Sequence, residues 1–211
     1  MPDYDANKGS ARENLCRYLA ACYYQPDPAF TEERMFESML EAARQIHPDV
    51  LVLARRLGEA FAQEGPESLL VDYTRLFLGP THALAQPYGS IWLDGPKIVM
   101  GESTLALLEI YEAGGFKIAE DFRELPDHIA AELEFLYLLI YRQNEAHRTG
   151  EPEAVRANAA LRKRFLAEHL SRWVGPFTAA VAARAESTFY RSLSEITERF
   201  VGMEVDEINA A

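Results

Sequence analysis

The sequence has few of the features that would place a chain outside the cytoplasm. Its only two cysteines, Cys16 and Cys22, lie roughly 240° apart around one predicted helix, so we expect both to be reduced core residues. No stretch reaches the roughly 18 consecutive apolar residues that a membrane span needs. The first ten residues carry acids and no apolar signal core. We therefore predict a cytoplasmic protein without stable membrane insertion.

Positive charge is also scarce. The chain has 21 lysines and arginines against 33 acidic residues, which gives a net charge of −12. Nucleic-acid binders need a basic surface, so we expect no nucleic-acid partner. Residues 94–134 hold ten acids and three bases, more than half of the net charge. Such a segment attracts cationic ligands, although an acidic face that only aids solubility explains it as well.

The motifs of common enzymes and metal sites are absent. A di-iron helical bundle needs Glu-x-x-His pairs, and none occurs in this chain. There is also no His-Glu-x-x-His, no Cys-x-x-Cys, no Gly-x-x-x-x-Gly-Lys-Ser/Thr phosphate loop and no Gly-x-Ser-x-Gly elbow. We therefore expect neither a metal site nor enzymatic activity.

Helical periodicity, by contrast, runs through most of the chain. Apolar residues spaced by three and four predict helices over 11–24, 49–63, 67–78, 103–113, 129–141, 153–170, 176–185 and 189–200, with a further helix beginning near Thr31. No segment alternates convincingly with period two. The sequence therefore predicts an all-α fold, a single-domain bundle of about 8–10 helices over 1–211, with 1–78 and 100–211 as candidate lobes joined by the loop 79–99.

The periodicity breaks off between Gly79 and Gly95. This stretch, GPTHALAQPYGSIWLDG, contains two prolines and three glycines, but it is too apolar for a disordered spacer. We expect a long structured loop around 79–95. Its prolines and glycines would hold Tyr88 and Trp92 at low entropic cost, which suits a recognition surface. Covering the core explains both aromatic residues equally well.

A second feature is Pro126-Asp127-His128 at the start of the most strongly patterned helix. An aspartate there caps free amides and complements the helix dipole, so a structural role accounts for Asp127. The same helix end disfavours an imidazolium, and a neutral His128 suits hydrogen bonding to a ligand. Without a nucleophile in a recognised context, the pair does not indicate catalysis.

Two blocks of sequence together resemble the TorD/DmsD family, the redox-enzyme maturation chaperones of bacteria and archaea. The first comprises YTRLFLGP at 73–80 and QPYGSIWLD at 86–94, and the second is PDHIAAELEF at 126–135. The resemblance implies an all-α cytoplasmic chaperone that binds the twin-arginine leader and the apo form of a molybdopterin oxidoreductase. It also implies that the chaperone assists insertion of bis-molybdopterin guanine dinucleotide into this client and prevents premature export through the Tat pathway.

The resemblance also assigns residues to leader binding. By position these are Pro87, Tyr88, Gly89, Ser90, Trp92, Asp127, His128 and Glu132. Tyr88 stands where members often have Trp, and Trp92 where they often have Tyr. A leader joins two arginines to an apolar stretch, so its binder should offer carboxylates beside an aromatic or aliphatic groove.

Other functions stay open at this point. Some family members have been proposed to bind GTP, which leaves weak GTP binding or nucleotide hydrolysis as one alternative, although no phosphate loop is present. A helical assembly subunit that stays bound to a redox complex is another. We expect no cofactor in the chaperone itself. The identity of the client is not fixed by the sequence, and long hinges allow either a monomer or a domain-swapped dimer.

Overall fold

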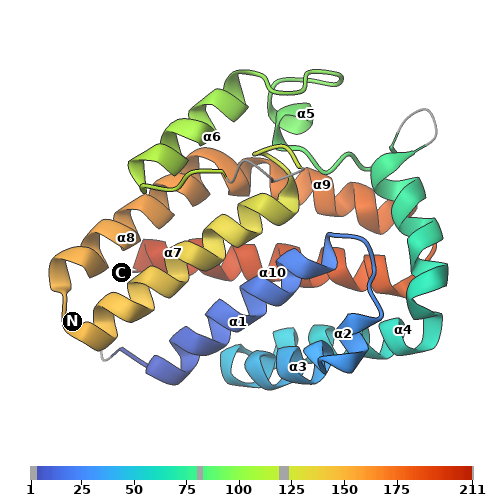
Figure 1. The fold of residues 1–211 in the computed structure, drawn as a ribbon, viewed down its shortest axis with the longest axis horizontal. Helices are drawn as coiled ribbons and strands as arrows, with labels where there is room; N and C mark the ends of the chain where they lie inside the picture. The colour runs from blue at the N-terminus through green and yellow to red at the C-terminus, as the bar shows by residue number, and fades with distance from the viewer. Residues whose placement is uncertain (1–3, 80–82, 119–123, 211) are drawn as a thin grey trace.

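The computed structural model describes residues 4–79, 83–118 and 124–210, and within these ranges the chain is helical without a β-strand (Figure 1). This confirms the predicted all-α fold. The elements, with η marking a π-helical turn, are α1 (Ala6–Cys22), α2 (Ala29–Glu32), α3 (Met35–Ile46), α4 (Pro48–Tyr73), η1 (Thr74–Leu78), α5 (Gly89–Leu93), α6 (Glu102–Ala113), α7 (Ile129–Thr149), α8 (Pro152–Phe165), η2 (Leu166–Leu170), α9 (Ser171–Arg184) and α10 (Thr188–Ala210). None of these helices is long and apolar enough to cross a bilayer.

Most helix boundaries follow local sequence signals. The side chain of Asp5 caps α1 by accepting hydrogen bonds from two amides of the first turn, at 3.0 and 3.1 Å. Pro48 and Pro152 occupy the first positions of α4 and α8, where the missing amide proton costs nothing. A left-handed Gly150 ends α7.

Two helices differ from the prediction in their continuity. The expected break before Pro66 is a kink inside α4, where Gly65 takes a φ of +72° that favours glycine. The expected interruption before Pro176 is absent, because α8, η2 and α9 follow one another directly. Pro176 lies inside α9 between the buried side chains of Trp173 and Phe177, whose packing holds the helix despite the lost hydrogen bond.

The helices pack around a core that draws on both ends of the chain. α1 and α7 lie side by side across the molecule, and α10 packs against α4 and α9 (Figure 1). Helices from 1–78 therefore share packing surfaces with helices from 100–211. Cys16 and Cys22 are buried and unpaired, as predicted.

The burial of α7 in the core leads to a test of core stability. Leu136 of α7 is 0% exposed, whereas Leu105 of α6 is 59% exposed. We expect Leu136→Ala to lower the free energy of unfolding by about 2–5 kcal/mol, because the truncation removes buried apolar surface and leaves a cavity. Leu105→Ala, the same chemical change at the surface, should shift it by no more than about 0.5 kcal/mol. Urea unfolding followed by circular dichroism measures both, and equal losses would contradict this packing.

Candidate functional site

The predicted loop 79–95 contains a short helix, α5, that the sequence did not predict. Its first turn is held by Asp127, whose Oδ2 accepts a hydrogen bond from the Ser90 amide at 2.9 Å. The backbone carbonyl of Asp127 accepts another from the Gly89 amide at 2.8 Å. Five residues are too few to show a helical period, and the cap comes from a distant segment. Residues 80–82 of the predicted loop lie outside the described residues.

The two sequence blocks that carry the family resemblance meet at this point. Tyr88 and His128 form an isolated antiparallel β-bridge, and the Ile129 amide donates to the Pro87 carbonyl at 2.8 Å. From α6, the hydroxyl of Thr104 donates to Asp127 Oδ2 at 3.2 Å. We call residues 87–90 together with 127–129 the clamp, because they join α5, α6 and α7.

The clamp lies inside the protein. Asp127 and Ser90 are 0% exposed and His128 is 2% exposed, and Pro87 and Gly89 are buried as well. The structure thus brings together most of the residues assigned to leader binding. The five residues just named, however, have almost no solvent-exposed surface. In this conformation they fix the position of neighbouring segments. Their direct contact with a leader stays a prediction.

His128 has a local structural role. Its Nδ1 caps α7 by accepting a hydrogen bond from the Ala130 amide at 3.2 Å. Its ring stacks on Tyr24 with centroids 6.1 Å apart, and it meets Tyr88 edge-on at 5.4 Å. Burial lowers the pKa of His128 to about 4, against the opposing effect of Asp127. The imidazole is therefore neutral at physiological pH.

Beneath the clamp lies a buried polar triad formed by Glu132, His169 and Trp173. Glu132 Oε1 is 2.8 Å from His169 Nε2, and Glu132 Oε2 accepts a hydrogen bond from Trp173 Nε1 at 3.2 Å. Burial raises the pKa of the Glu132 carboxyl. Burial alone would lower the pKa of His169, but Glu132 outweighs it, and the net shift is upward. Sequence reasoning identified Glu132 and missed its two partners, which come from η2 and α9.

Gly89 rests directly on this triad. A Cβ atom at position 89 would lie 3.1 Å from Glu132 Oε1, from His169 Nε2 and from Trp173 Nε1. That is closer than ordinary van der Waals contact, so the absence of a side chain is what lets α5 approach the triad. The glycine of the sequence motif is thus explained by packing.

Two glutamates lie at the surface beside the clamp. The Tyr88 hydroxyl donates to Glu124 Oε2 at 3.4 Å, and the Tyr24 hydroxyl donates to Glu134 Oε1 at 2.9 Å. All four side chains are partly exposed. Burial, followed by the charge of Glu124, raises the pKa of Tyr88 to about 12, and burial raises the pKa of Glu134. We call Tyr24, Tyr88, Glu124 and Glu134 the acid–tyrosine surface.

The chemistry available at this surface is that of a cation receptor. Within the described ranges neither Glu124 nor Glu134 forms an ion pair with a lysine or arginine. The same part of the chain holds no group of three or more His, Cys, Asp or Glu side chains arranged for a metal ion. Trp92 contributes less directly, because its Nε1 donates to the Gln86 carbonyl at 2.9 Å and its ring packs edge-on against Phe177.

The close approach at Gly89 can be tested with one methyl group. Gly89→Ala should lower the free energy of unfolding by about 1–3 kcal/mol, because the triad must move to accommodate the new Cβ. Gly202→Ala should raise it by about 0.5–1 kcal/mol, because Gly202 is exposed in α10 and a Cβ added there would meet no atom from the rest of the protein within 4 Å. Chemical unfolding followed by tryptophan fluorescence measures both. An unchanged stability in Gly89→Ala would show that α5 does not rest on the triad.

Burial of neutral His128 should make stability depend on pH. The pKa of His128 is about 6.5 in the unfolded chain and about 4 in the folded protein. As the pH falls below 6.5, the unfolded chain therefore binds a proton at this histidine before the folded protein does, which favours unfolding. Between these values the wild type should lose up to about 3 kcal/mol relative to His128→Asn, which keeps a capping acceptor but does not titrate. Urea titrations across this range test the difference.

His47→Asn provides the matched control, because His47 caps α4 from an exposed position. Comparing the two variants at each pH separates the effect of burying the histidine from the effect of replacing a helix-capping histidine by asparagine. Parallel stability profiles for His128→Asn and the wild type would contradict the burial of a neutral imidazole.

Comparison with known proteins supports this fold and the family resemblance carried by the two sequence blocks. A family model described as nitrate reductase delta subunit matches residues 41–179, more than half of the chain. A chaperone protein TorD from Aliivibrio salmonicida is 27% identical over 175 residues, covering 82% of this chain and 80% of the relative. A Tat proofreading chaperone DmsD from Salmonella typhimurium is 29% identical over 136 residues, covering 64% of this chain and 60% of the relative.

A solved structure shares the architecture. It is described as a redox enzyme maturation protein from Archaeoglobus fulgidus, and it superposes with a TM-score of 0.56 at 23% identity, covering 90% of this chain and 93% of that one. At this identity the likeness shows the fold alone. The relatives that match in sequence are named chaperones. With the family model matching the segment that contains both blocks, the chain belongs to the TorD/DmsD family of redox-enzyme maturation chaperones.

Proposed function

We propose that the protein is a cytoplasmic chaperone that binds the twin-arginine leader and the apoprotein of a molybdopterin oxidoreductase. In this role it assists cofactor insertion and prevents premature export. Membership of the TorD/DmsD family supports a role in redox-enzyme maturation. The acid–tyrosine surface supports the leader as the part of the client that is bound.

The observation that carries this proposal is the pairing of each surface glutamate with a tyrosine. A guanidinium binds a carboxylate through two parallel hydrogen bonds and stacks on an aromatic ring. Glu124 with Tyr88 and Glu134 with Tyr24 each offer both elements, and the His128 ring packs against both tyrosines. The surface therefore has the chemistry to receive two adjacent arginines.

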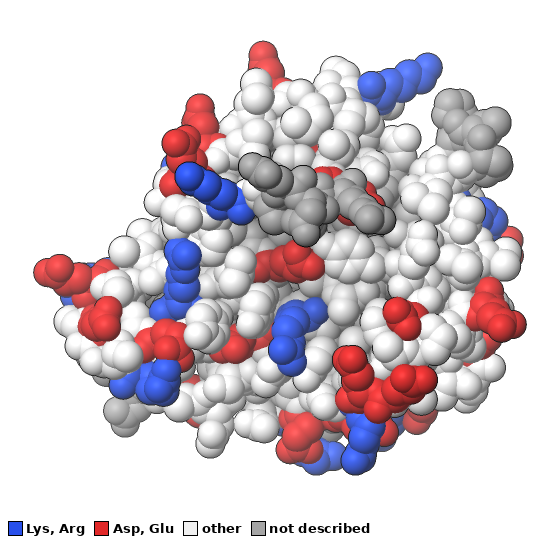
Figure 2. Space-filling model, viewed as in Figure 1, with Lys and Arg blue, Asp and Glu red and all other residues white. Residues whose placement is uncertain are grey.

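The apolar part of a leader needs an uncharged surface in addition to the arginine subsites. The segment between α5 and α6 presents Ile98, Val99 and Met100, each between 43% and 47% exposed. Figure 2 shows that on the face that includes α1 and α7, charged side chains of both signs are separated by wide uncharged areas. Apolar contact of this kind would set the residence time, while the acidic charge would favour rapid capture.

On this proposal the residues of the sequence motif divide into two roles. Tyr88 contacts the leader. Asp127, His128 and Ser90 act as positioning residues, because they are buried and hold the segments that carry Tyr88 and Glu124. Glu132 positions α5 from below through the triad.

The test replaces the two carboxylates without changing side-chain shape. We expect the double variant Glu124→Gln with Glu134→Gln to bind a fluorescent twin-arginine leader peptide at least about tenfold more weakly, because two charge-assisted contacts are lost. Its binding should also depend less on salt than that of the wild type. Fluorescence anisotropy at low and high salt measures both properties.

Glu109→Gln with Glu112→Gln is the matched control, since both acids are exposed on α6 within the same acidic segment and make no ion pair in the described ranges. This variant removes the same net charge and should keep wild-type affinity. If both double variants weaken binding equally, the leader responds only to net charge. If neither does, the acid–tyrosine surface is not where the arginines bind.

A further inference from the structure

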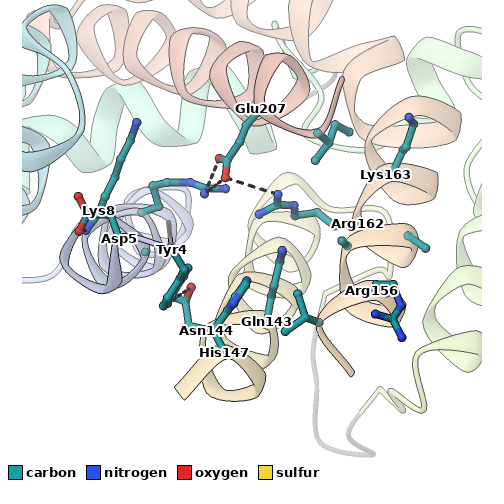
Figure 3. A pocket seen from close by; sticks show the side chains of 16 residues that line it. Tyr4, Asp5, Lys8, Gln143, Asn144, His147, Arg156, Arg162, Lys163 and Glu207 are labelled. Atoms are coloured by element: carbon teal, nitrogen blue, oxygen red, sulfur yellow. Dashed lines mark hydrogen bonds and ion pairs between the residues drawn. The ribbon is translucent and has the colours of Figure 1, made fainter. Parts of the chain in front are cut away.

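A cleft of about 560 Å³ opens at the opposite end of α7 from the clamp, between the start of α1, the end of α7, α8 and the end of α10 (Figure 3). Its size lies within the range of small-molecule sites. Val155, Ala159 and Ala160 give it an apolar wall of small side chains from α8. No part of the proposed leader surface lies in this cleft.

The cleft concentrates positive charge in an acidic protein. Its lining contains five cationic residues, Lys8, Arg12, Arg156, Arg162 and Lys163. Three carboxylates oppose them, Asp5 and Glu207 in the lining and Glu204 directly behind Arg12. The local balance is therefore an excess of two positive charges, whereas the whole chain carries −12. An anion would meet attractive short-range contacts here that the bulk composition does not suggest.

The two buried arginines, Arg12 and Arg162, contact the same two glutamates, but only Arg12 forms short hydrogen bonds with them. Arg12 donates to both oxygens of Glu204, at 2.7 and 2.6 Å, and also donates to Glu207. Arg162 reaches the same glutamates only at 3.5 and 3.9 Å, beyond the roughly 2.7–2.9 Å of charge-assisted hydrogen bonds. Figure 3 shows Arg162 extending from α8 toward Glu207. Arg12 is thus well satisfied and Arg162 is not.

Unused hydrogen-bonding groups line the cleft. The side chain of Arg162 is 4% exposed, and its Nε has no hydrogen-bond partner in the described part of the chain. The side-chain oxygen of Gln143 on α7 is likewise buried without a partner, and rotating this amide presents an N–H donor instead. Burial lowers the pKa of Arg162, as expected for a charge that its own carboxylates compensate incompletely. Buried donors without partners are uncommon, and a bound ligand is one way to satisfy them.

We propose that this cleft binds a phosphate monoester whose organic part is small and apolar. A phosphate monoester carries about −1.5 to −2 charges at neutral pH, which matches the excess of two positive charges better than the single charge of a carboxylate. Its three terminal oxygens accept from Arg162 and Gln143 while Arg156 and Lys163 neutralise it from the rim. The apolar wall of α8 receives the organic part.

The remaining wall of the cleft includes two aromatic side chains, Tyr4 and His147. The rings of Tyr4 and His147 stack with centroids 4.0 Å apart and 6° between their planes. The Tyr4 hydroxyl also donates to Asn144 Oδ1 at 2.8 Å, which ties the start of the chain to α7. Together with the small aliphatic side chains of α8, these aromatic rings favour a flat organic group.

Calorimetric titration of the full-length chain in phosphate-free buffer tests the site, with phenyl phosphate as the probe and benzoate and inorganic phosphate as comparisons. Phenyl phosphate should bind at one saturable site, at least about tenfold more tightly than benzoate. Inorganic phosphate should bind more weakly than phenyl phosphate, because it lacks the apolar part. Binding of benzoate as tight as that of phenyl phosphate, or no saturable binding of either, would overturn the proposal.

Variants locate the site. Arg156 and Lys163 are exposed, so Arg156→Gln with Lys163→Gln should fold normally and weaken phenyl phosphate binding at least about tenfold. Arg164→Gln, on the same helix but paired with Glu168, should leave binding unchanged. Ala159→Phe should abolish binding by filling the cleft. Unaltered affinity in both the double variant and Ala159→Phe would place the phosphate elsewhere and refute the proposal.

Arg162 itself is a poor target, since removing it would leave Glu204 and Glu207 less compensated in a buried place. The glutamine substitutions at Glu124 and Glu134 should not affect phenyl phosphate binding, because they lie at the other end of α7. Failure of the leader experiment and failure of this one are therefore distinguishable.

Discussion

The buried carboxylate of Asp127 is the point on which the arrangement of α5, α6 and α7 depends. A carboxylate out of contact with water is costly unless it is hydrogen-bonded, and leaving a buried polar group without its donor commonly costs about 1–3 kcal/mol, more when the group is charged. Here the donors are the amide of Ser90 in α5 and the hydroxyl of Thr104 in α6, while Asp127 itself directly precedes α7. Moving α5 or α6 alone would remove one of the two donors, and moving the start of α7 away from both would remove both.

The clamp changes how the family motifs are interpreted. The blocks around 87–90 and 126–129 are the two sides of one buried contact, so much of their chemical character is explained by what the fold needs. Gly89 is small because the triad lies beneath it, and His128 is neutral because it is buried. On the proposed function, a leader meets these residues indirectly, through the side chains whose positions they determine. Tyr88 has both a structural and a surface role, since its backbone is part of the clamp and its hydroxyl donates to Glu124 at the surface.

The sequence predicted the helices well where apolar periodicity and local glycine or proline residues determine their extent. α7 and α10 have long apolar stripes, and Gly65-Pro66 marks the kink in α4. It failed for α5, whose cap comes from Asp127, and at Pro176, where core packing overrides a helix breaker. The motif residues were found by resemblance. Partners that lie far away in sequence, such as His169 and Tyr24, carry no local signal and could only be found in the structure.

The two proposed sites place opposite electrostatic demands on one chain. Glu134 and Asn144 lie ten residues apart on α7, or about 15 Å along the helix, which exceeds the Debye length of about 8 Å at physiological salt. The net charge of −12 attracts a cationic leader from a distance and repels an anion. A phosphate at the cleft must therefore be held by contacts made after it arrives, which is what a buried arginine with unused donors supplies. Because salt screens the electrostatic interaction between the two ends of α7, an acidic surface and a basic cleft can lie on the same helix.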